Sequence, residues 1–224
     1  MSKTIPLIIF NMQTLAIVLS LLFALRLNKY SNAAPYMKGF YLYPLIALII
    51  NIPLSLTSQF FHDYKKYATI LNNLSLVFHF SFLSLFIIQV IPSYKRRNLL
   101  KVMFAFFCLL IIVFLVFEKI SKPNNLAFGV TNFGLALFCA IYYYELFDNI
   151  PILNLRNEPS FWIVTGVFFC MSIHVPLVST YDYLYSKAPI SFTRISNSIA
   201  IFCYVVMHLF FIKACLCSVH SAKE

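Results

Sequence analysis

Polar side chains that interrupt the apolar stretches of this chain are the first candidates for chemistry. Asn72, Ser75 and His79 recur at positions i, i+3 and i+7, which places all three on one face of a helix. His174 and His208 interrupt two later apolar stretches. Polar groups in hydrocarbon are costly and usually face the interior of a helical bundle, so we expect a ligand site or a polar pathway there. The candidate residues for it are Asn72, Ser75, His79, Asn132, His174 and His208.

Three interpretations of the histidines follow from the chemistry of imidazole. They could ligate zinc, copper or the iron of a haem, but no two of them have HxxxH or HxxH spacing and no carboxylate accompanies them. They could hydrogen-bond to Ser, Thr or Asn on neighbouring helices, each bond contributing roughly 0.6 to 2 kcal/mol. One of them could instead contact a ligand or respond to protons, because imidazole titrates near neutrality. The spacing favours the structural interpretation over metal ligation, and we expect no metal and no cofactor.

Other polar residues in the apolar stretches have simpler interpretations. Asn51 lies two residues before Pro53, where its side chain is suited to bond a backbone group that the proline frees. Gln13 is a single polar residue that we expect to join neighbouring helices. Glu145 and Asp148 are expected at the membrane interface, at the end of a helix.

Motifs of common enzymes are missing from the sequence. The chain contains no GxSxG, HExxH or CxxC, and its four glycines form no phosphate-binding loop. We therefore expect a non-enzymatic protein. Gly166, beside Thr165, is expected to allow one close approach between two helices.

All of these candidates lie on helices that we predict to cross a lipid bilayer. Of the 224 residues, 61% are hydrophobic and 11% are charged, whereas a soluble domain has about 25% charged residues. Crossing the hydrocarbon core takes about 20 apolar residues, and seven stretches approach or exceed that length. We predict an all-α protein, a single domain over residues 1–224 that forms a bundle of seven transmembrane helices. The predicted spans are residues 5–25, 40–61, 71–91, 99–117, 126–146, 160–181 and 196–217. Pro53 and Pro176 lie inside the second and sixth spans and are predicted to kink them.

Basic residues predict how the bundle lies in the membrane. Ten of the 17 Lys and Arg residues fall on the side that includes the C-terminus, which favours a cytoplasmic C-terminus and an N-terminus outside. The net charge of +10 is assigned to contacts with lipid headgroups, and we expect no nucleic-acid partner. A basic loop between the third and fourth helices gives the strongest signal and is the expected surface for a protein partner. Its residues are Lys95, Arg96, Arg97 and Lys101.

A family resemblance adds to this interpretation. The sixth helix opens with Asn157-Glu-Pro-Ser-Phe-Trp-Ile-Val-Thr-Gly-Val-Phe-Phe169, after the run Tyr142-Tyr-Tyr-Glu145. The last helix opens with Ser196-Asn-Ser198. In these motifs, and in length and number of spans across the chain, the sequence resembles an uncharacterised family of seven-transmembrane-helix proteins from bacteria of the Bacteroidota. The resemblance implies a bacterial inner membrane location, an association with kinase-type signalling and no known activity. At His79 the chain departs from the family pattern, in which an acidic residue is common.

The expected function follows from compact architecture and missing catalytic motifs. We expect a sensory or receptor-like module, or the membrane partner of a signalling protein. The alternative is a small transporter or channel with a polar path between the third, sixth and seventh helices. A third hypothesis is an intramembrane metal or haem protein centred on the three histidines. The small-molecule ligand is not identified by the sequence.

Overall fold

The fold is a bundle of long helices. The computed structural model describes residues 4–27, 34–60, 65–118, 120, 124–149, 155–187 and 189–221, which form helices and no strand. The long helices are α1 (Thr4–Leu27), α3 (Leu42–Phe60), α4 (Lys65–Val90), α5 (Tyr94–Phe117), α6 (Asn125–Asn149), α7 (Pro159–Ser179) and α9 (Pro189–Ser221). Short helices at α2 (Pro35–Lys38), η2 (Leu155–Asn157) and α8 (Tyr181–Lys187) join them. The prediction of an all-α protein is confirmed for the described residues.

Length and composition allow most of these helices to cross a membrane. Within the described residues, six helices are long and apolar enough, and Met12–Leu27 is a shorter apolar helix. The six are Pro35–Leu54, Lys66–Val90, Tyr94–Phe117, Asn125–Asp148, Pro159–Ser179 and Ser191–Val219. The long apolar helices indicate an integral membrane protein.

Three helices begin earlier than the apolar stretches predict. α4 begins at Lys65 instead of residue 71, α5 at Tyr94 instead of 99, and α9 at Pro189 instead of 196. Lys and Arg are good helix formers whose long side chains reach away from the hydrocarbon, so a helix continues past the edge of its apolar stretch. The predicted basic loop is therefore wrong, because its residues occupy the first turns of α5. They are Lys95, Arg96, Arg97 and Lys101.

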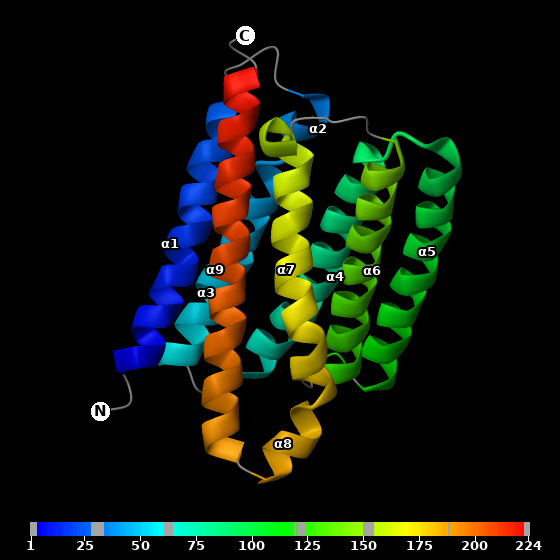
Figure 1. Cartoon of the computed structure of the whole chain (residues 1–224). Helices are drawn as coiled ribbons and strands as arrows, with labels where there is room; N and C mark the ends of the chain where they lie inside the picture. The colour runs from blue at the N-terminus through cyan, green and yellow to red at the C-terminus, as the bar shows by residue number, and fades with distance from the viewer. Residues whose placement is uncertain are drawn as a thin grey trace.

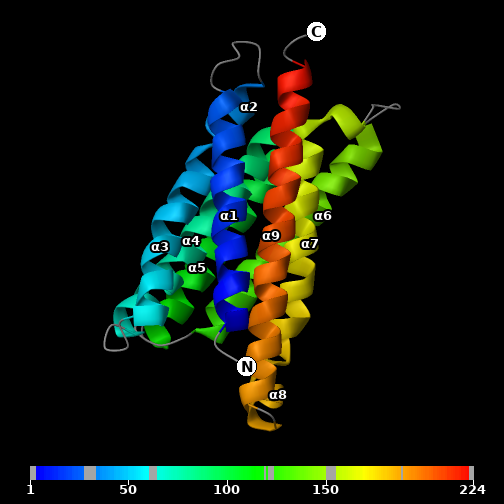
Figure 2. The ribbon, with the colours of Figure 1, turned by 90° about the vertical axis from the view of Figure 1, so that its left-hand side faces the viewer.

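Helix α9 makes the two most extensive helix contacts of the bundle, because it lies along both α1 and α7 (Figures 1 and 2). α6 packs against α7 and α4, and α3 packs against α1 and α4. α5 lies at the edge of the bundle against α4 and α6 (Figure 1). Successive long helices run in opposite directions, and the N- and C-termini lie at opposite ends of the bundle. We call these the N-terminal end and the C-terminal end.

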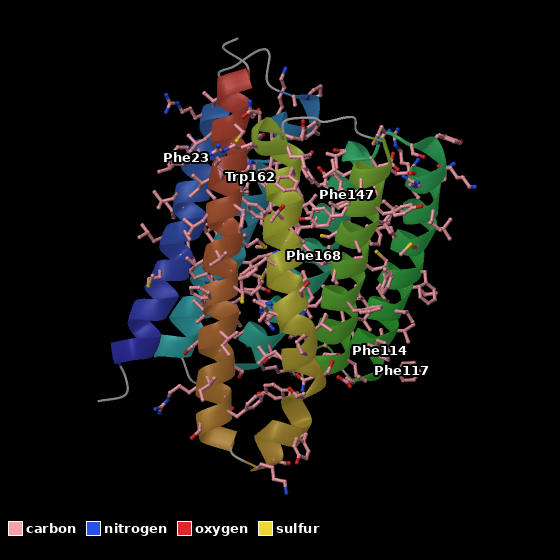
Figure 3. The ribbon with its side chains drawn as sticks, viewed as in Figure 1. Phe23, Phe114, Phe117, Phe147, Trp162 and Phe168 are labelled. Carbon is pink, nitrogen blue, oxygen red and sulfur yellow. The ribbon has the colours of Figure 1, made fainter. Side chains whose placement is uncertain are left out.

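Apolar side chains fill the core and also cover the outside. Phe80 and Phe138 are fully buried, whereas Phe117 and Phe147 are 81% and 79% exposed. Figure 3 shows Phe117 near the end of α5, at the outer edge of the bundle. An apolar surface of this kind is unfavourable in water and ordinary in lipid. The surface therefore agrees with the membrane location that the helix lengths indicate.

Glycine and proline residues lie inside helices α3 and α7. A Cβ atom at Gly166 would come within 2.7 Å of the Phe210 Cβ, which confirms the predicted close approach and places it between α7 and α9. Pro53 lies inside α3 and Pro176 inside α7. The carbonyl of Pro176 accepts a hydrogen bond from the Thr180 hydroxyl at 2.9 Å. A kink at either proline stays a prediction.

Candidate ligand-binding cavity

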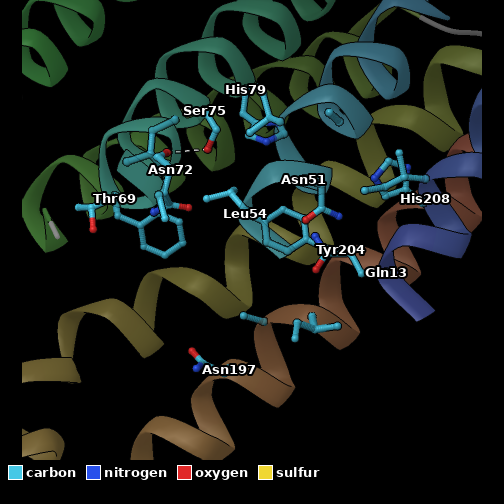
Figure 4. A pocket seen from close by; sticks show the side chains of 18 residues that line it. Gln13, Asn51, Leu54, Thr69, Asn72, Ser75, His79, Asn197, Tyr204 and His208 are labelled. Carbon is cyan, nitrogen blue, oxygen red and sulfur yellow. Dashed lines mark hydrogen bonds between the residues drawn. The ribbon is translucent and has the colours of Figure 1, made fainter. Parts of the chain in front are cut away.

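A cavity of about 500 Å³ lies between α1, α3, α4 and α9 (Figure 4). Nine of its lining residues are polar: Gln13, Asn51, Thr69, Asn72, Ser75, His79, Asn197, Tyr204 and His208. Nine are apolar: Ile17, Ala47, Ile50, Leu54, Ala68, Leu76, Phe128, Ala200 and Ile201. The described lining therefore has as many polar as apolar residues, although most of its surface is apolar, and none of these residues is Asp, Glu, Lys or Arg.

Helix α4 supplies one wall of the cavity. Asn72, Ser75 and His79 line it, as the residues of one helix face should. Helix α9 supplies another wall through Asn197, Tyr204 and His208, and α1 and α3 add Gln13 and Asn51. No residue of α7 lines it. The sequence placed a polar path between the third, sixth and seventh helices, whereas this cavity lies between the first, second, third and seventh, with Phe128 of the fifth also in its lining.

The exposed residues of the cavity lining lie toward the N-terminal end of the bundle. Asn72 and Asn197, near the starts of α4 and α9, are exposed. His79 and His208 lie farther along the same two helices, toward the middle of the bundle. Beyond them, fully buried rings of Phe40, Tyr43 and Phe211 pack together, with ring centroids 5.2 Å apart for Phe40–Phe211 and 5.5 Å for Tyr43–Phe211. The cavity is thus closed by an aromatic layer at its inner end.

Two hydrogen bonds hold the histidines at the inner end. The Nδ1 atom of His79 lies 2.9 Å from the hydroxyl of Tyr43 on α3. The Nδ1 atom of His208 lies 2.9 Å from the hydroxyl of Ser20 on α1. The Tyr43 ring also packs against both imidazoles, at centroid distances of 5.5 Å and 6.2 Å. Each histidine is fixed by a side chain outside the cavity lining.

Asn51 brings an unused hydrogen-bond donor to the cavity. Its side chain is 8% exposed, and its Nδ2 atom has no hydrogen-bond partner. The predicted bond from this side chain to a backbone group near Pro53 is therefore not made through Nδ2. A buried donor without a partner is unfavourable, and this atom has almost no accessible surface, so a bound molecule gains its hydrogen bond only when the side chain turns toward the cavity.

Two predicted site residues lie outside the cavity. His174 is fully buried; its Nδ1 bonds the Cys170 carbonyl at 2.7 Å, and its Nε2 has no partner. The ring of Tyr204 packs between the cavity and His174, with a centroid distance of 5.2 Å to that imidazole. Asn132 is 1% exposed and does not line the cavity either.

The geometry does not support a common metal centre for the three histidines. Tyr204 packs against both His79 and His174, at 6.4 Å and 5.2 Å. Across the described ranges, no group of three His, Cys, Asp or Glu side chains is placed to share one metal ion. The imidazoles are instead separate residues, two at the cavity and one behind its wall.

The C-terminal end of the bundle carries an ion-pair cluster. The Arg96 guanidinium donates to the carboxylates of Glu145 and Asp148 on α6 and lies 4.5 Å from the centre of the Tyr144 ring. Arg97 donates to the Ile91 carbonyl at 2.8 Å and 3.1 Å. These two arginines therefore stabilise the fold. Of the four predicted partner-facing residues, Lys95 and Lys101 are exposed, whereas Arg96 and Arg97 are half-buried.

A hydroxyl–carboxylate network lies at the same end. Tyr36 and Ser160 both donate to Glu158 Oε1, at 2.7 Å and 2.8 Å, and the Tyr142 hydroxyl lies 2.9 Å from the Ser160 hydroxyl. The network ties α2, α6 and α7 together. Tyr143 adds a second bond between α6 and α7, donating to Thr165 at 2.9 Å. Polar contacts therefore hold the helices together at the C-terminal end of the bundle, whereas the cavity lies toward the N-terminal end.

Sequence reasoning missed part of the cavity. It assigned Gln13 to a contact between helices and Asn51 to a backbone group near Pro53. It named Asn197 only within the motif Ser196-Asn-Ser198, and it did not name Tyr204. A signal was present on the last helix, because Asn197, Tyr204 and His208 are spaced i, i+7 and i+11 and share one face.

Comparisons with protein-family models, with curated proteins and with solved structures found no match. Architecture and cavity therefore define the class: an all-helical membrane protein with a polar cavity that is closed at its inner end.

Proposed function

We propose that this protein is a receptor-like, non-enzymatic membrane module that binds a small neutral molecule in the cavity between α1, α3, α4 and α9. One observation carries the proposal: a mixed polar and apolar cavity of about 500 Å³ that ends at two hydrogen-bonded histidines. Its volume is within the range of about 300 to 1,000 Å³ that is usual for ligand pockets. The cavity lining combines amide and aliphatic side chains, and this combination suits a molecule with both polar groups and an apolar body.

Neutrality of the ligand follows from the lining. A buried ion needs an opposite charge, and the 18 lining residues within the described part of the chain include no Asp, Glu, Lys or Arg. Four carboxamide and hydroxyl groups near the mouth and walls offer hydrogen bonds to uncharged partners instead. They are Gln13, Asn51, Asn72 and Ser75.

The orientation that fits this function has seven transmembrane helices, the N-terminus outside and the C-terminus in the cytoplasm of a bacterium. The cavity then opens to the outside of the inner membrane. The opposite end presents Lys95 and Lys101, both exposed on α5, to a cytoplasmic signalling partner. The resemblance to seven-helix proteins of the Bacteroidota agrees with such a role. Fusion of a periplasm-dependent phosphatase to the C-terminus tests the topology: an inactive fusion is expected, and an active fusion contradicts the orientation.

Ligand binding is tested with a variant that fills the cavity. Ala200 lines it, whereas Ala105 is exposed on the outer face of α5. We expect that neutral compounds which raise the thermal stability of the protein in lipid nanodiscs fail to stabilise Ala200→Phe and still stabilise Ala105→Phe. Stabilisation of both variants, or of neither, by every such compound would place binding elsewhere and refute the proposal.

A transporter is the second candidate function, and a specific observation favours it. The cavity reaches the middle of the bundle and is closed beyond His79 and His208 by Tyr43 and Phe211, as expected for a transporter open to one side. Uptake into proteoliposomes separates the two functions. A compound whose binding is abolished by Ala200→Phe should accumulate in the vesicles only if the protein transports it. The ion pairs and hydrogen bonds that tie the C-terminal end together favour the receptor, because a transporter has to open there.

A further inference from the structure

The hydrogen bonds around the two cavity histidines favour one position for the proton on each ring. The Ser20 hydroxyl donates its single proton to the Ile17 carbonyl at 2.9 Å. Its oxygen then accepts from His208, which places the proton of that imidazole on Nδ1 as long as the serine keeps its bond to Ile17. In a neutral ring, the Nε2 atom of His208 is then a hydrogen-bond acceptor.

The same reasoning gives the opposite result for His79. Tyr43 is fully buried, and among the described residues its hydroxyl has one hydrogen-bond partner, the Nδ1 atom of His79. If that nitrogen carried the proton, the buried phenol proton would have no acceptor, which is unfavourable. Tyr43 therefore donates to Nδ1, and the neutral His79 ring carries its proton on Nε2 as a hydrogen-bond donor.

The inner end of the cavity thus offers both kinds of hydrogen bond. His79 donates through Nε2 and His208 accepts at Nε2, and the unpartnered Nδ2 of Asn51 adds a donor when its buried side chain turns toward the cavity. A carboxamide with an N–H group matches this set: its carbonyl oxygen has two lone pairs for the two donors, and its N–H has the acceptor. An ester or a tertiary amide lacks the donor and leaves the lone pair of His208 unpaired.

We propose that the cavity recognises a neutral ligand through a primary or secondary carboxamide, which accepts hydrogen bonds from His79 and Asn51 and donates one to His208. The proposal rests on the proposed function, because it assigns the ligand class of the same cavity. The apolar lining residues, among them Ile17, Ile50 and Leu76, would hold the apolar body of the molecule.

A pair of nearly isosteric probes tests the ligand class. N-methyl-4-butylbenzamide and methyl 4-butylbenzoate differ by an N–H in place of an oxygen. We expect the amide to bind the purified protein in nanodiscs at least about tenfold more tightly than the ester, since a buried polar group left unpaired is strongly selected against. Equal affinities, or binding of neither probe, would overturn the assignment. If another neutral compound is still blocked by Ala200→Phe, only the carboxamide assignment fails and the proposed function stands.

Nitrogen NMR of histidine-labelled protein tests the tautomers without any ligand. We expect one imidazole protonated at Nδ1 and assigned to His208, and one protonated at Nε2 and assigned to His79. The Ser20→Ala variant should lose the Nδ1 preference of His208 and reduce the preference for the amide probe over the ester. Ser84→Ala is the matched control, because Ser84 is buried in α4 and does not line the cavity. Protonation of His208 at Nε2 in the unmodified protein would refute the mechanism.

Discussion

A single methyl group at the contact between α7 and α9 provides a quantitative test of the packing. In Gly166→Ala, the new Cβ would lie 2.7 Å from the Phe210 Cβ and 3.2 Å from the Met207 carbonyl oxygen. Both atoms belong to or sit directly on the α9 backbone, so relief requires the two helices to move apart. At Gly129 the same substitution meets one atom, Val178 Cγ1, at an ordinary 3.5 Å.

The expected difference in unfolding free energy follows from a comparison of Gly166→Ala with Gly129→Ala. Replacing Gly by Ala inside a helix stabilises it by roughly 0.5 to 1 kcal/mol in either case, so this contribution cancels in the difference. The remaining difference is the overpacking at Gly166, about 1 to 3 kcal/mol. We expect Gly166→Ala to be less stable than Gly129→Ala by this amount. Gly134→Ala should fall between them, because the nearest atom there is the Phe80 ring edge at 2.9 Å, which can rotate.

Reversible unfolding in mixed detergent micelles with increasing dodecyl sulfate measures these free energies. Trp162 is the single tryptophan of the chain and stacks on Phe210 with ring centroids 5.9 Å apart. Its fluorescence therefore reports the contact between α7 and α9 directly. Free energies of unfolding for Gly166→Ala and Gly129→Ala that agree within about 0.5 kcal/mol would refute the close approach of the two helices.

Two further predictions concern the C-terminal end of the bundle. Arg96→Gln should lower the thermal unfolding temperature of the purified protein, because it removes the guanidinium that pairs with the buried Glu145 carboxylate. Lys95→Gln, at an exposed position, should not lower it. Equal unfolding temperatures of the two variants would contradict the ion-pair assignment. Ser160→Ala should cost about 1 kcal/mol of unfolding free energy in the same micelle assay, because it breaks a network of buried hydrogen bonds. Ser172→Ala, on an exposed face of α7, is its control and should change the free energy little.

The fold was largely predictable because the membrane imposes a simple rule. Stretches of about 20 apolar residues without charge have few alternatives to a helix that crosses the bilayer, and each predicted span overlaps a long helix of the structure. Helix ends were less predictable, since they depend on local backbone hydrogen bonds and not on hydrophobicity. The seven-residue extension of α9 down to Pro189 illustrates this.

The candidate site was predictable only in part, because it depends on which helices are neighbours. The face of α4 with Asn72 and His79 could be identified from spacing along one helix. The contribution of α1 and α3 could not, since single residues such as Gln13 and Asn51 carry no periodic signal. In the same way, the pairing of Arg96 with Glu145 joins residues of α5 and α6, and the sequence placed these two charges in separate roles.

The uncharged lining of the cavity also determines how the membrane voltage acts on it. Moving one elementary charge through 100 mV changes the free energy by about 2.3 kcal/mol. A neutral molecule entering a cavity lined by uncharged groups moves no net charge through the field. For the neutral ligand that we propose, we therefore expect occupancy of the cavity to be the same before and after depolarisation at a given free ligand concentration.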